Sequence, residues 1–421
     1  MRFATKGARP RRIVRLLWAI AIASVMMPAV APADSDNYVE IARGKALATI
    51  GDCVACHTAP GGTPFAGGLA LQTPFGAIMT PNITADNTTG IGSWSADDFA
   101  RALHDGRRPG GTYLYPAFPY PYYSRVTRAD TDAIYAYLHS LPAVVNRVNH
   151  NTLPFPFNIR LSMIGWNALF FTPGGFAPDS GRSGEFNRGA YLVEGLGHCG
   201  ACHTPLNAFG ANQADQYLQG NQIDHWTAPN ITNDRQAGLG KWSVDDTVQY
   251  LKTGQTRTSI ASGPMKDVVE NSTSKMPDAD LRAIAVYLKE RGAEGPRPPA
   301  ALLSSDARVR MGEAIFVDTC AACHKRSGEG VVHLFPRLAG NVIATQDDPA
   351  SLIRIILTGG RGAATDATPT APAMPSLGYR LGDEQVAAVV TYVRNSWGNA
   401  ASPVSAEMVK ALRERVSAAR E

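Results

Sequence analysis

The sequence predicts an all-α protein of three tandem units, and three observations support this prediction. All six cysteines lie in three Cys-x-x-Cys pairs, the segments around these pairs repeat, and the alternating pattern of half-buried strands is nearly absent. The 421 residues suffice for two to four domains of about 100–200 residues each. With 44% hydrophobic and 18% charged residues, the composition excludes a disordered, collagen-like or coiled-coil protein.

Each unit begins with an apolar stretch that ends at a cysteine pair. Residues 43–53 (RGKALATIGDC) recur as residues 188–199 (RGAYLVEGLGHC) and, more loosely, as residues 311–320 (MGEAIFVDTC). The apolar positions follow the helical period. Each stretch is therefore predicted to form a short amphipathic helix that delivers its cysteines at its C-terminal end.

A second repeat lies downstream of the first two cysteine pairs. The sequence Pro-Asn-Ile-Thr at 81–84 recurs at 229–232, and each copy precedes a Gly-x-Gly-x-Trp-Ser sequence. The serine and the aspartate three residues later match a capping box, which opens a helix. The matching residues are Ser95 with Asp98 and Ser243 with Asp246.

Every unit is predicted to close with another helix. This helix starts with acidic residues at 130 and 132, at 278 and 280, and at 383 and 384, and it continues into an aromatic turn. Segments rich in Asn, Pro and Gly mark the linkers. The predicted layout is a signal peptide at 1–33, domains at 34–145, 184–290 and 306–400, linkers at 146–183 and 291–305, and a C-terminal helical tail at 401–421.

Two other apolar stretches are candidates for membrane contact. Residues 159–171 contain Arg160 and Asn167 and are too short to span a bilayer, so we predict a buried connecting helix. Because acidic residues dilute the positive charge of the tail, we expect a solvated or subunit-docked helix there rather than a bilayer anchor. The residues that share one helical face in the tail are Met408, Val409, Leu412 and Val416.

Residues 1–33 have the features of a cleaved export signal. They carry six basic residues and no acidic ones, an apolar run at 16–27, and small residues at Ala31 and Ala33 that suit cleavage before Asp34. Subtracting these six charges from the net charge of +4 leaves −2 for the mature chain. The mature chain is therefore expected outside the cytoplasm, with no basic surface for nucleic acid.

A histidine directly follows each cysteine pair, which is the attachment signature of c-type haem. Two thiols on one turn can form thioethers with the haem vinyl groups, and the next imidazole can bind the iron. Structural zinc would require four N or S ligands per site, and thioredoxin-like pairs do not need the histidine. We therefore predict three covalently bound haem c groups. Their candidate residues are Cys53, Cys56 and His57, Cys199, Cys202 and His203, and Cys320, Cys323 and His324.

The sixth iron ligand decides what each haem can do. A His/Met pair fills both axial positions and raises the potential, whereas an open iron suits ligand binding or catalysis. Met265 lies 62 residues after His203, and Met374 lies 50 residues after His324. Both are predicted on a loop ahead of the closing helix. Met276 competes with Met265, but it abuts that helix, so Met265 is the preferred ligand.

The first unit departs from this pattern. The matching position, 61 residues after His57, holds Phe118, which cannot bind iron. Met79 is the nearest thioether, and His104 and His139 are further candidates. A five-coordinate or weakly liganded iron is the remaining alternative.

Taken together, these motifs resemble those of the three-haem cytochrome c subunits of bacterial membrane-bound alcohol, gluconate and sorbitol dehydrogenases. The resemblance extends from about residue 38 to residue 399 and implies three tandem class I cytochrome c domains with long loops. In this family a methionine often stands where this chain has Phe118. The quoted motifs include YPAFPY at 115–120, GHCGACHTP at 197–205, GPM at 263–265 and AMPS at 373–376.

The resemblance also implies a role. A partner subunit that carries flavin or pyrroloquinoline quinone would oxidise a sugar, sugar acid or alcohol in the periplasm. The haems would then pass the electrons to ubiquinone at the periplasmic face of the inner membrane, and the chain would have no substrate-oxidising site of its own. Two alternatives stay open, namely a stand-alone periplasmic electron carrier and a haem enzyme that uses an open first haem.

Overall fold

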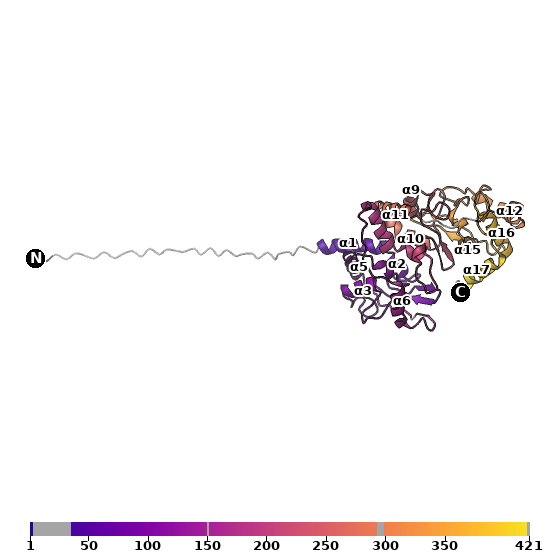
Figure 1. The fold of residues 1–421 in the computed structure, drawn as a ribbon. Helices are drawn as coiled ribbons and strands as arrows, with labels where there is room; N and C mark the ends of the chain where they lie inside the picture. Colours follow the sequence, from indigo (N-terminus) through magenta and orange to yellow (C-terminus); the bar gives the residue numbers. More distant parts are fainter. Residues whose placement is uncertain (3–34, 150, 293–298, 419–421) are drawn as a thin grey trace.

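The computed structural model describes residues 1–2, 35–149, 151–292 and 299–418. Apart from its first two residues, the predicted signal peptide lies outside the described residues. Helices dominate the described chain, as predicted, and they follow the sequence from one end of the molecule to the other (Figure 1).

Three pairs of long helices pack in the same way. Each pair joins the helix before a cysteine pair to the helix that closes the same unit, in agreement with the helices predicted from the repeats. Figure 1 shows the first pair at the left of the molecule and the third pair at the right. The pairs are α1 (Ser35–Ile50) with α5 (Arg128–Ser140), α7 (Gly184–Tyr191) with α11 (Asp278–Glu290), and α12 (Ala307–Thr319) with α16 (Asp383–Arg394).

A glycine allows the two helices of each pair to approach closely. An added Cβ on the glycine would lie only 1.8, 2.0 or 2.1 Å from a backbone carbonyl oxygen in the pairs Gly44–Ala133, Gly189–Ala283 and Gly312–Ala388, respectively. Such a contact is far shorter than van der Waals packing allows, so a side chain at these crossings would force the helices apart. The glycine of each sequence repeat therefore has the same packing role.

Capping boxes open two of the helices, as predicted. The hydroxyl of Ser95 accepts a hydrogen bond from the backbone N–H of Asp98 at 3.1 Å before α3 (Ala96–Asp105). The same arrangement of Ser243 and Asp246 opens α9 (Val244–Thr253). In the third unit, α15 (Ala350–Thr358) begins without a side-chain cap.

Shorter helices carry or flank the candidate site residues. A π-helical turn at Leu192–Leu196 continues α7, so each helix before a cysteine pair ends within three residues of its first cysteine. The short helices are α2 (Cys53–Cys56), α4 (Tyr120–Tyr123), α6 (Met163–Phe170), α8 (Cys199–His203), α10 (Pro264–Asn271), α13 (Ala321–His324) and α14 (Val342–Thr345), with 3-10 turns at Arg160–Ser162, Ala214–Gln216 and Thr273–Lys275.

Three two-stranded antiparallel hairpins interrupt the helices, although the sequence analysis expected only loops there. Strands of two to four residues are too short for an alternating pattern to reveal them. The hairpins are β1 (Ala70–Thr73) with β2 (Gly76–Met79), β3 (Asn221–Ile223) with β4 (Trp226–Ala228), and β5 (Gly360–Arg361) with β6 (Ala373–Met374).

The first two units share one apolar core. A single cluster of buried side chains includes Leu47 and Ile134 from the first unit and Leu192 and Leu281 from the second. A separate cluster, which includes Phe316, fills the third unit. The first two predicted domains are therefore joined by buried contacts as well as by a linker.

The C-terminal tail forms α17 (Ala406–Ala418), which packs against α15 and α16. Val409, Leu412 and Val416 are buried in the core of the third unit, whereas Met408 is exposed. The apolar face of the tail therefore packs against the third unit, whereas the sequence analysis expected it to face solvent or another subunit. Val409, Leu412 and Val416 complete the core that α15 and α16 contribute to.

The prediction of a buried helix at 159–171 is wrong. No residue of α6 is buried, and the exposed fractions of Leu161 and Leu169 are 70% and 76%. The polar groups point inward instead, because the side-chain oxygen of Asn167 accepts a hydrogen bond from the hydroxyl of Tyr120. Within the described parts of the chain, no helix combines the length and apolar character needed to cross a bilayer.

Candidate haem-binding sites

Each Cys-x-x-Cys-His motif forms a helical turn directly after a long helix. In the first two motifs the chain enters this turn through a residue in the left-handed region, Asp52 (φ 50°) or His198 (φ 36°). In the third motif, α12 continues through Cys320 into α13. The turn brings the two cysteines and the histidine of each motif together, as covalent attachment of one haem requires.

The carbonyl group of a proline holds each motif histidine. A carbonyl oxygen only accepts hydrogen bonds, so Nδ1 carries the proton and Nε2 keeps its lone pair. This orientation is the one that a proximal iron ligand needs. The distances from Nδ1 to the carbonyl oxygen are 2.8 Å for His57–Pro81, 2.7 Å for His203–Pro229 and 3.1 Å for His324–Pro336.

Burial keeps the three imidazoles neutral. It lowers the pKa of His57, His203 and His324, although the hydrogen bond to each proline carbonyl opposes this effect. Neutral imidazole is the form that binds a metal ion. The hydrogen bonds that hold these rings use Nδ1 and leave Nε2 available.

Burial makes the motif cysteines poorly suited to thiol exchange. In each motif the first cysteine is half-buried and the second is exposed. Burial raises the pKa of Cys53 and Cys199 to about 12 and that of Cys320 to about 11. A thiol–disulfide catalyst needs a lowered pKa, so these pairs fit haem attachment better than redox exchange.

Met265 and Met276 occupy different kinds of position. Met276 is 3% exposed and directly precedes the N-cap residue of α11. Val126 before α5 and Leu381 before α16 take the same place and are also buried. Met276 therefore fills a core position that every unit has. Met265 lies half-buried in the first turn of α10, rather than on the predicted loop, and packs near Tyr250.

Met374 lies in a hairpin rather than on the predicted loop. It ends β6 and pairs with Gly360 of β5. Its side chain is half-buried against the core of the third unit. The hairpin therefore fixes the backbone of Met374, which lies in the sequence between the third motif and α16.

Phe118 packs into the shared core of the first two units. Its ring centroid lies 5.3 Å from that of Tyr123. The same cluster includes Cys53 of the first motif. The loop ahead of the closing helix in the first unit thus presents an aromatic ring, which has no lone pair for iron, in place of a thioether.

Met79 lies close along the chain to the proline that holds His57. It ends β2, only two residues before Pro81, and the Pro81 carbonyl oxygen holds the His57 ring. The side-chain oxygen of Asn151 accepts a hydrogen bond from the Met79 N–H at 3.0 Å. Met79 also lines a surface cleft with Pro81, Tyr115 and Arg160.

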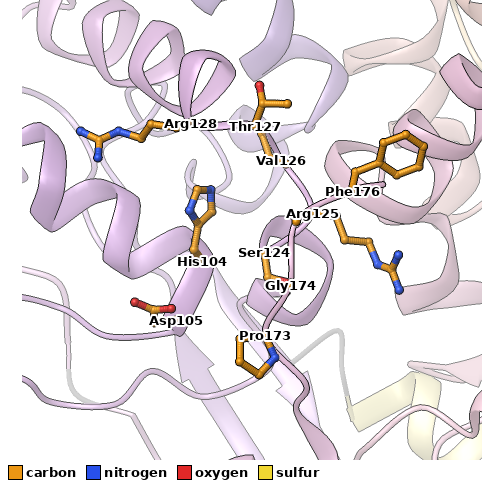
Figure 2. Close-up of a pocket in the computed structure, with 11 residues that line it drawn as sticks. His104, Asp105, Ser124, Arg125, Val126, Thr127, Arg128, Pro173, Gly174 and Phe176 are labelled. Carbon is orange, nitrogen blue, oxygen red and sulfur yellow. The ribbon is translucent and has the colours of Figure 1, made fainter. Parts of the chain in front are cut away.

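The two histidine candidates of the first unit have other partners. Nε2 of His104 lies 3.0 Å from the hydroxyl of Thr131. Figure 2 shows His104 in a surface cleft with Arg125 and Arg128, and no residue of the Cys-x-x-Cys-His motifs lines this cleft. Nδ1 of His139 lies 3.1 Å from the backbone oxygen of Tyr135. The buried Nε2 of His139 has no hydrogen-bond partner among the described residues, so these contacts argue against His104 and not against His139.

The first and second motifs meet at the boundary between their units. Nε2 of His198 lies 3.4 Å from the backbone oxygen of Gly51. Ser272 donates a hydrogen bond to the backbone oxygen of Ile50 at 3.0 Å. The two attachment points therefore belong to one continuous packed region.

Asp52 lies at this boundary, and the sequence analysis did not single it out. One oxygen of its carboxyl group is buried without a hydrogen-bond partner. Burial, with Asp267 nearby, raises the pKa of Asp52 to about 8, although Lys275 opposes this shift. At the same place in the second motif, burial lowers the pKa of His198. Both side chains are therefore held largely neutral near pH 7.

The third unit attaches to the second through the β3–β4 hairpin. The Thr227 N–H donates a hydrogen bond to the hydroxyl of Ser351 at 2.7 Å. The guanidinium carbon of Arg354 lies 4.7 Å from the centroid of the Trp226 ring. The third unit thus contacts the second unit through α15 and the β3–β4 hairpin, a different surface from the one that faces the first motif.

The sequence analysis did not identify the prolines that orient the motif histidines. Pro81 and Pro229 lie in the repeated Pro-Asn-Ile-Thr sequence, so the repeat itself was the available signal. Pro336 lies only 12 residues after His324 and has no such repeat around it. The common role of these residues is visible only in three dimensions.

Comparisons with known proteins agree with this site. The cytochrome c family profile matches residues 41–142 and 309–397, which contain the first and third motifs. The chain is 42% identical over 424 residues to the gluconate 2-dehydrogenase cytochrome c subunit of Pantoea cypripedii, covering 96% of each chain. It is 39% identical over 419 residues to the cytochrome c subunit of the quinone-type alcohol dehydrogenase of Gluconobacter oxydans (strain 621H), covering 95% of this chain and 87% of that one. The fructose dehydrogenase cytochrome subunit of Gluconobacter japonicus is 39% identical over 406 residues, covering 90% of this chain and 84% of its own.

Proposed function

Because the chain belongs to the family of dehydrogenase cytochrome c subunits, we propose that it is a three-haem electron carrier in a complex with a partner dehydrogenase. The observation that carries this proposal is the threefold recurrence of a Cys-x-x-Cys-His turn whose imidazole is held at Nδ1 by a proline carbonyl. When bound, the haem iron supplies the one-electron chemistry.

In this proposal the chain folds as three tandem class I cytochrome c domains at 34–145, 184–290 and 306–400. The six motif cysteines hold the haems, and His57, His203 and His324 are the proximal iron ligands. Met265 and Met374 complete the second and third sites. Their thioethers raise the potentials of these haems into a range that suits electron transfer.

The first site differs, because Phe118 stands where the other two units offer Met265 and Met374. Phe118 has no lone pair for iron, and Met79 lies only two residues before Pro81, whose carbonyl group holds His57. The first haem is therefore proposed to have an open or weakly liganded iron. This observation also supports a second candidate function, a haem enzyme that reacts at the first iron.

Electrons are proposed to pass between the first two haems through the core that their units share. Cys53 and Cys199 both pack against this core, which therefore connects their attachment points. The β3–β4 hairpin and α15 provide the connection to the third haem.

The partner is proposed to be a large subunit that carries flavin or pyrroloquinoline quinone and oxidises a sugar, sugar acid or alcohol. The proposed electron acceptor is ubiquinone at the periplasmic face of the inner membrane. Residues 1–33 are proposed to direct export and then to be cleaved. The similarity to the gluconate, alcohol and fructose dehydrogenase subunits supports this choice of partner.

Affinity purification of the tagged chain from native membranes in mild detergent tests the proposal. Mass spectrometry should identify a large flavin or quinoprotein dehydrogenase in equal amount with the chain. A protein recovered alone from the soluble periplasm would contradict the subunit role and would favour the stand-alone carrier. Rapid reaction of the reduced first haem with an oxidant would favour the haem enzyme.

A further inference from the structure

The segment around α6 forms a large exposed apolar surface on the first unit. Figure 1 places α6 at the lower edge of the molecule, far from α12 and α16. Phe155, Leu161, Leu169 and Phe209 have exposed fractions between 67% and 78%. Single exposed apolar residues are common on soluble proteins, but a contiguous group of this kind marks a binding surface.

Aromatic contacts show that this surface is continuous across separate segments of the chain. The ring centroids of Phe75 and Phe157 lie 4.8 Å apart, and those of Phe170 and Phe209 lie 5.7 Å apart. The indole N–H of Trp166 donates a hydrogen bond to the backbone oxygen of Phe209 at 3.0 Å. The β1–β2 turn, the segment 155–171 and the loop after the second motif therefore build one apolar surface, defined here as the α6 surface.

Arginines without acidic partners border the α6 surface. The guanidinium of Arg160 lies 4.4 Å from the Tyr115 ring centroid and donates a hydrogen bond to the backbone oxygen of Tyr113. Burial lowers the pKa of Arg160, and the nearby charge of Arg108 lowers it further. The guanidinium carbon of Arg107 lies 4.5 Å from the Tyr113 ring centroid. Within the described chain, none of these three arginines forms an ion pair with a carboxylate.

The segments that build the α6 surface also lack acidic residues. No Asp or Glu occurs at 53–85, 106–129, 133–178 or 195–214. The surface therefore combines exposed aromatic and aliphatic side chains with positive charge alone. This combination is typical of protein surfaces that lie in the interfacial region of a bilayer, where anionic headgroups attract arginine and repel carboxylates.

We propose that the α6 surface docks the protein on the anionic surface of a phospholipid bilayer. This inference rests on the proposed function, since it supplies the contact with the membrane that electron delivery to a quinone requires. The position of α6 explains why the contact lies near the first haem site. Tyr120, whose hydroxyl donates to Asn167 of α6, follows Phe118 by two residues.

A protein partner fits the α6 surface less well than a bilayer does. The rim of a protein interface commonly carries charges of both signs, which complementary charges on the partner then match. The segments of the α6 surface have no acidic residue, and their exposed apolar side chains come from α6 and from the turns and loops beside it. Shallow insertion into headgroups requires only such exposed apolar side chains.

Vesicle flotation of the full-length holoprotein tests this proposal. Binding to vesicles of phosphatidylglycerol and phosphatidylcholine is compared for the wild type and the Leu161→Asp/Leu169→Asp variant. The matched control is Leu303→Asp/Tyr379→Asp, which adds the same charge at two exposed apolar residues of the third unit. We expect the α6 variant to bind at least about tenfold more weakly, because two exposed leucines no longer leave water. The control should bind like the wild type.

A second comparison tests the charge component. Wild-type binding should weaken when phosphatidylcholine alone forms the vesicles. The Arg107→Gln/Arg108→Gln variant should lose about 30-fold in binding to anionic vesicles, at roughly 1 kcal/mol per arginine. Equal binding of all variants, or no binding of the wild type, would overturn the proposal. Loss of the dehydrogenase from the α6 variant with unchanged vesicle binding would overturn it as well and would identify a protein interface. If the wild type still co-purifies with its dehydrogenase in detergent, a failure to bind vesicles overturns the membrane contact and leaves the subunit role intact.

Discussion

In the first unit α1 crosses α5 at Gly44, and in the second α7 crosses α11 at Gly189. In both, a proline carbonyl holds the motif histidine, and an apolar residue directly before the closing helix is buried. The two units differ in the segment ahead of that helix, where the first unit has Phe118 in a loop and the second has Met265 in the first turn of α10. The comparison teaches that the framework around a Cys-x-x-Cys-His motif can be kept while a candidate iron ligand is lost.

The largest expected effect concerns the part that the units share. Gly189→Ala should destabilise the protein by about 3 kcal/mol, because its Cβ would lie 2.0 Å from the Ala283 carbonyl oxygen. Gly44→Ala should cost a similar amount. Thermal unfolding of the holoprotein measures both. Gly165→Ala in α6 is the matched control, because no atom lies within 4 Å of its added Cβ and stability should not fall. A much smaller loss of stability for one of the two variants would show that the two helix crossings are not equivalent.

The next effect concerns the part that differs. In the wild type we expect carbon monoxide to bind one reduced haem, and Phe118→Met should abolish that binding by supplying a thioether. The potential of the first haem should rise by an amount on the order of 0.1 V, equivalent to about 2.3 kcal/mol per electron. Optical redox titration and carbon monoxide difference spectra measure these changes. Met79→Ala should change neither property. A new carbon monoxide-binding haem in Met79→Ala would identify Met79 as the ligand and would remove the difference between the units.

A third difference lies directly before the motifs, where the first unit has Asp52 and the second has His198. The folded chain holds the proton of Asp52 up to about pH 8, whereas the unfolded chain releases it near the ordinary pKa of 3.8. The folded state therefore binds the extra proton between these values, and stability should fall as pH rises from about 4 to about 8. Asp52→Asn should remove this slope, so its stability relative to the wild type should rise as the pH increases from about 4 to about 8. Melting temperatures across this pH range provide the test, and an unchanged slope in the variant would contradict it.

The smallest expected effect separates the two methionines of the second unit. Met276→Leu replaces one core side chain by another of similar volume, so it should cost less than about 1.5 kcal/mol and leave the haem spectrum unchanged. Met265→Leu should instead open the second iron to carbon monoxide. The reverse pattern would make Met276 the ligand and would place the sixth ligand next to the closing helix.

The sequence predicted the parts of the fold that depend on local patterns. The long helices before and after each motif follow from apolar periodicity, and the capping boxes at Ser95 and Ser243 follow from side chains three residues apart. The helix after Ala406 was also foreseeable. In each case neighbours in the sequence are neighbours in space.

The remaining features depend on contacts between distant segments. The core that Leu47 shares with Leu281 has no local signal. Hydropathy alone predicted burial of α6, but it could not show that Asn167 points inward and Leu169 outward. The sequence favoured Met265 over Met276 only because Met276 abuts the closing helix, and the equivalence of Met276 with Val126 supplies the structural reason.

The most direct test of the central claim is the intact mass of the exported protein under denaturing conditions. A chain that begins at Asp34 and carries three covalently bound haem groups is the predicted result. A mass that corresponds to two haem groups or fewer would show that at least one Cys-x-x-Cys-His motif does not attach haem and would contradict the equivalence of the three frameworks.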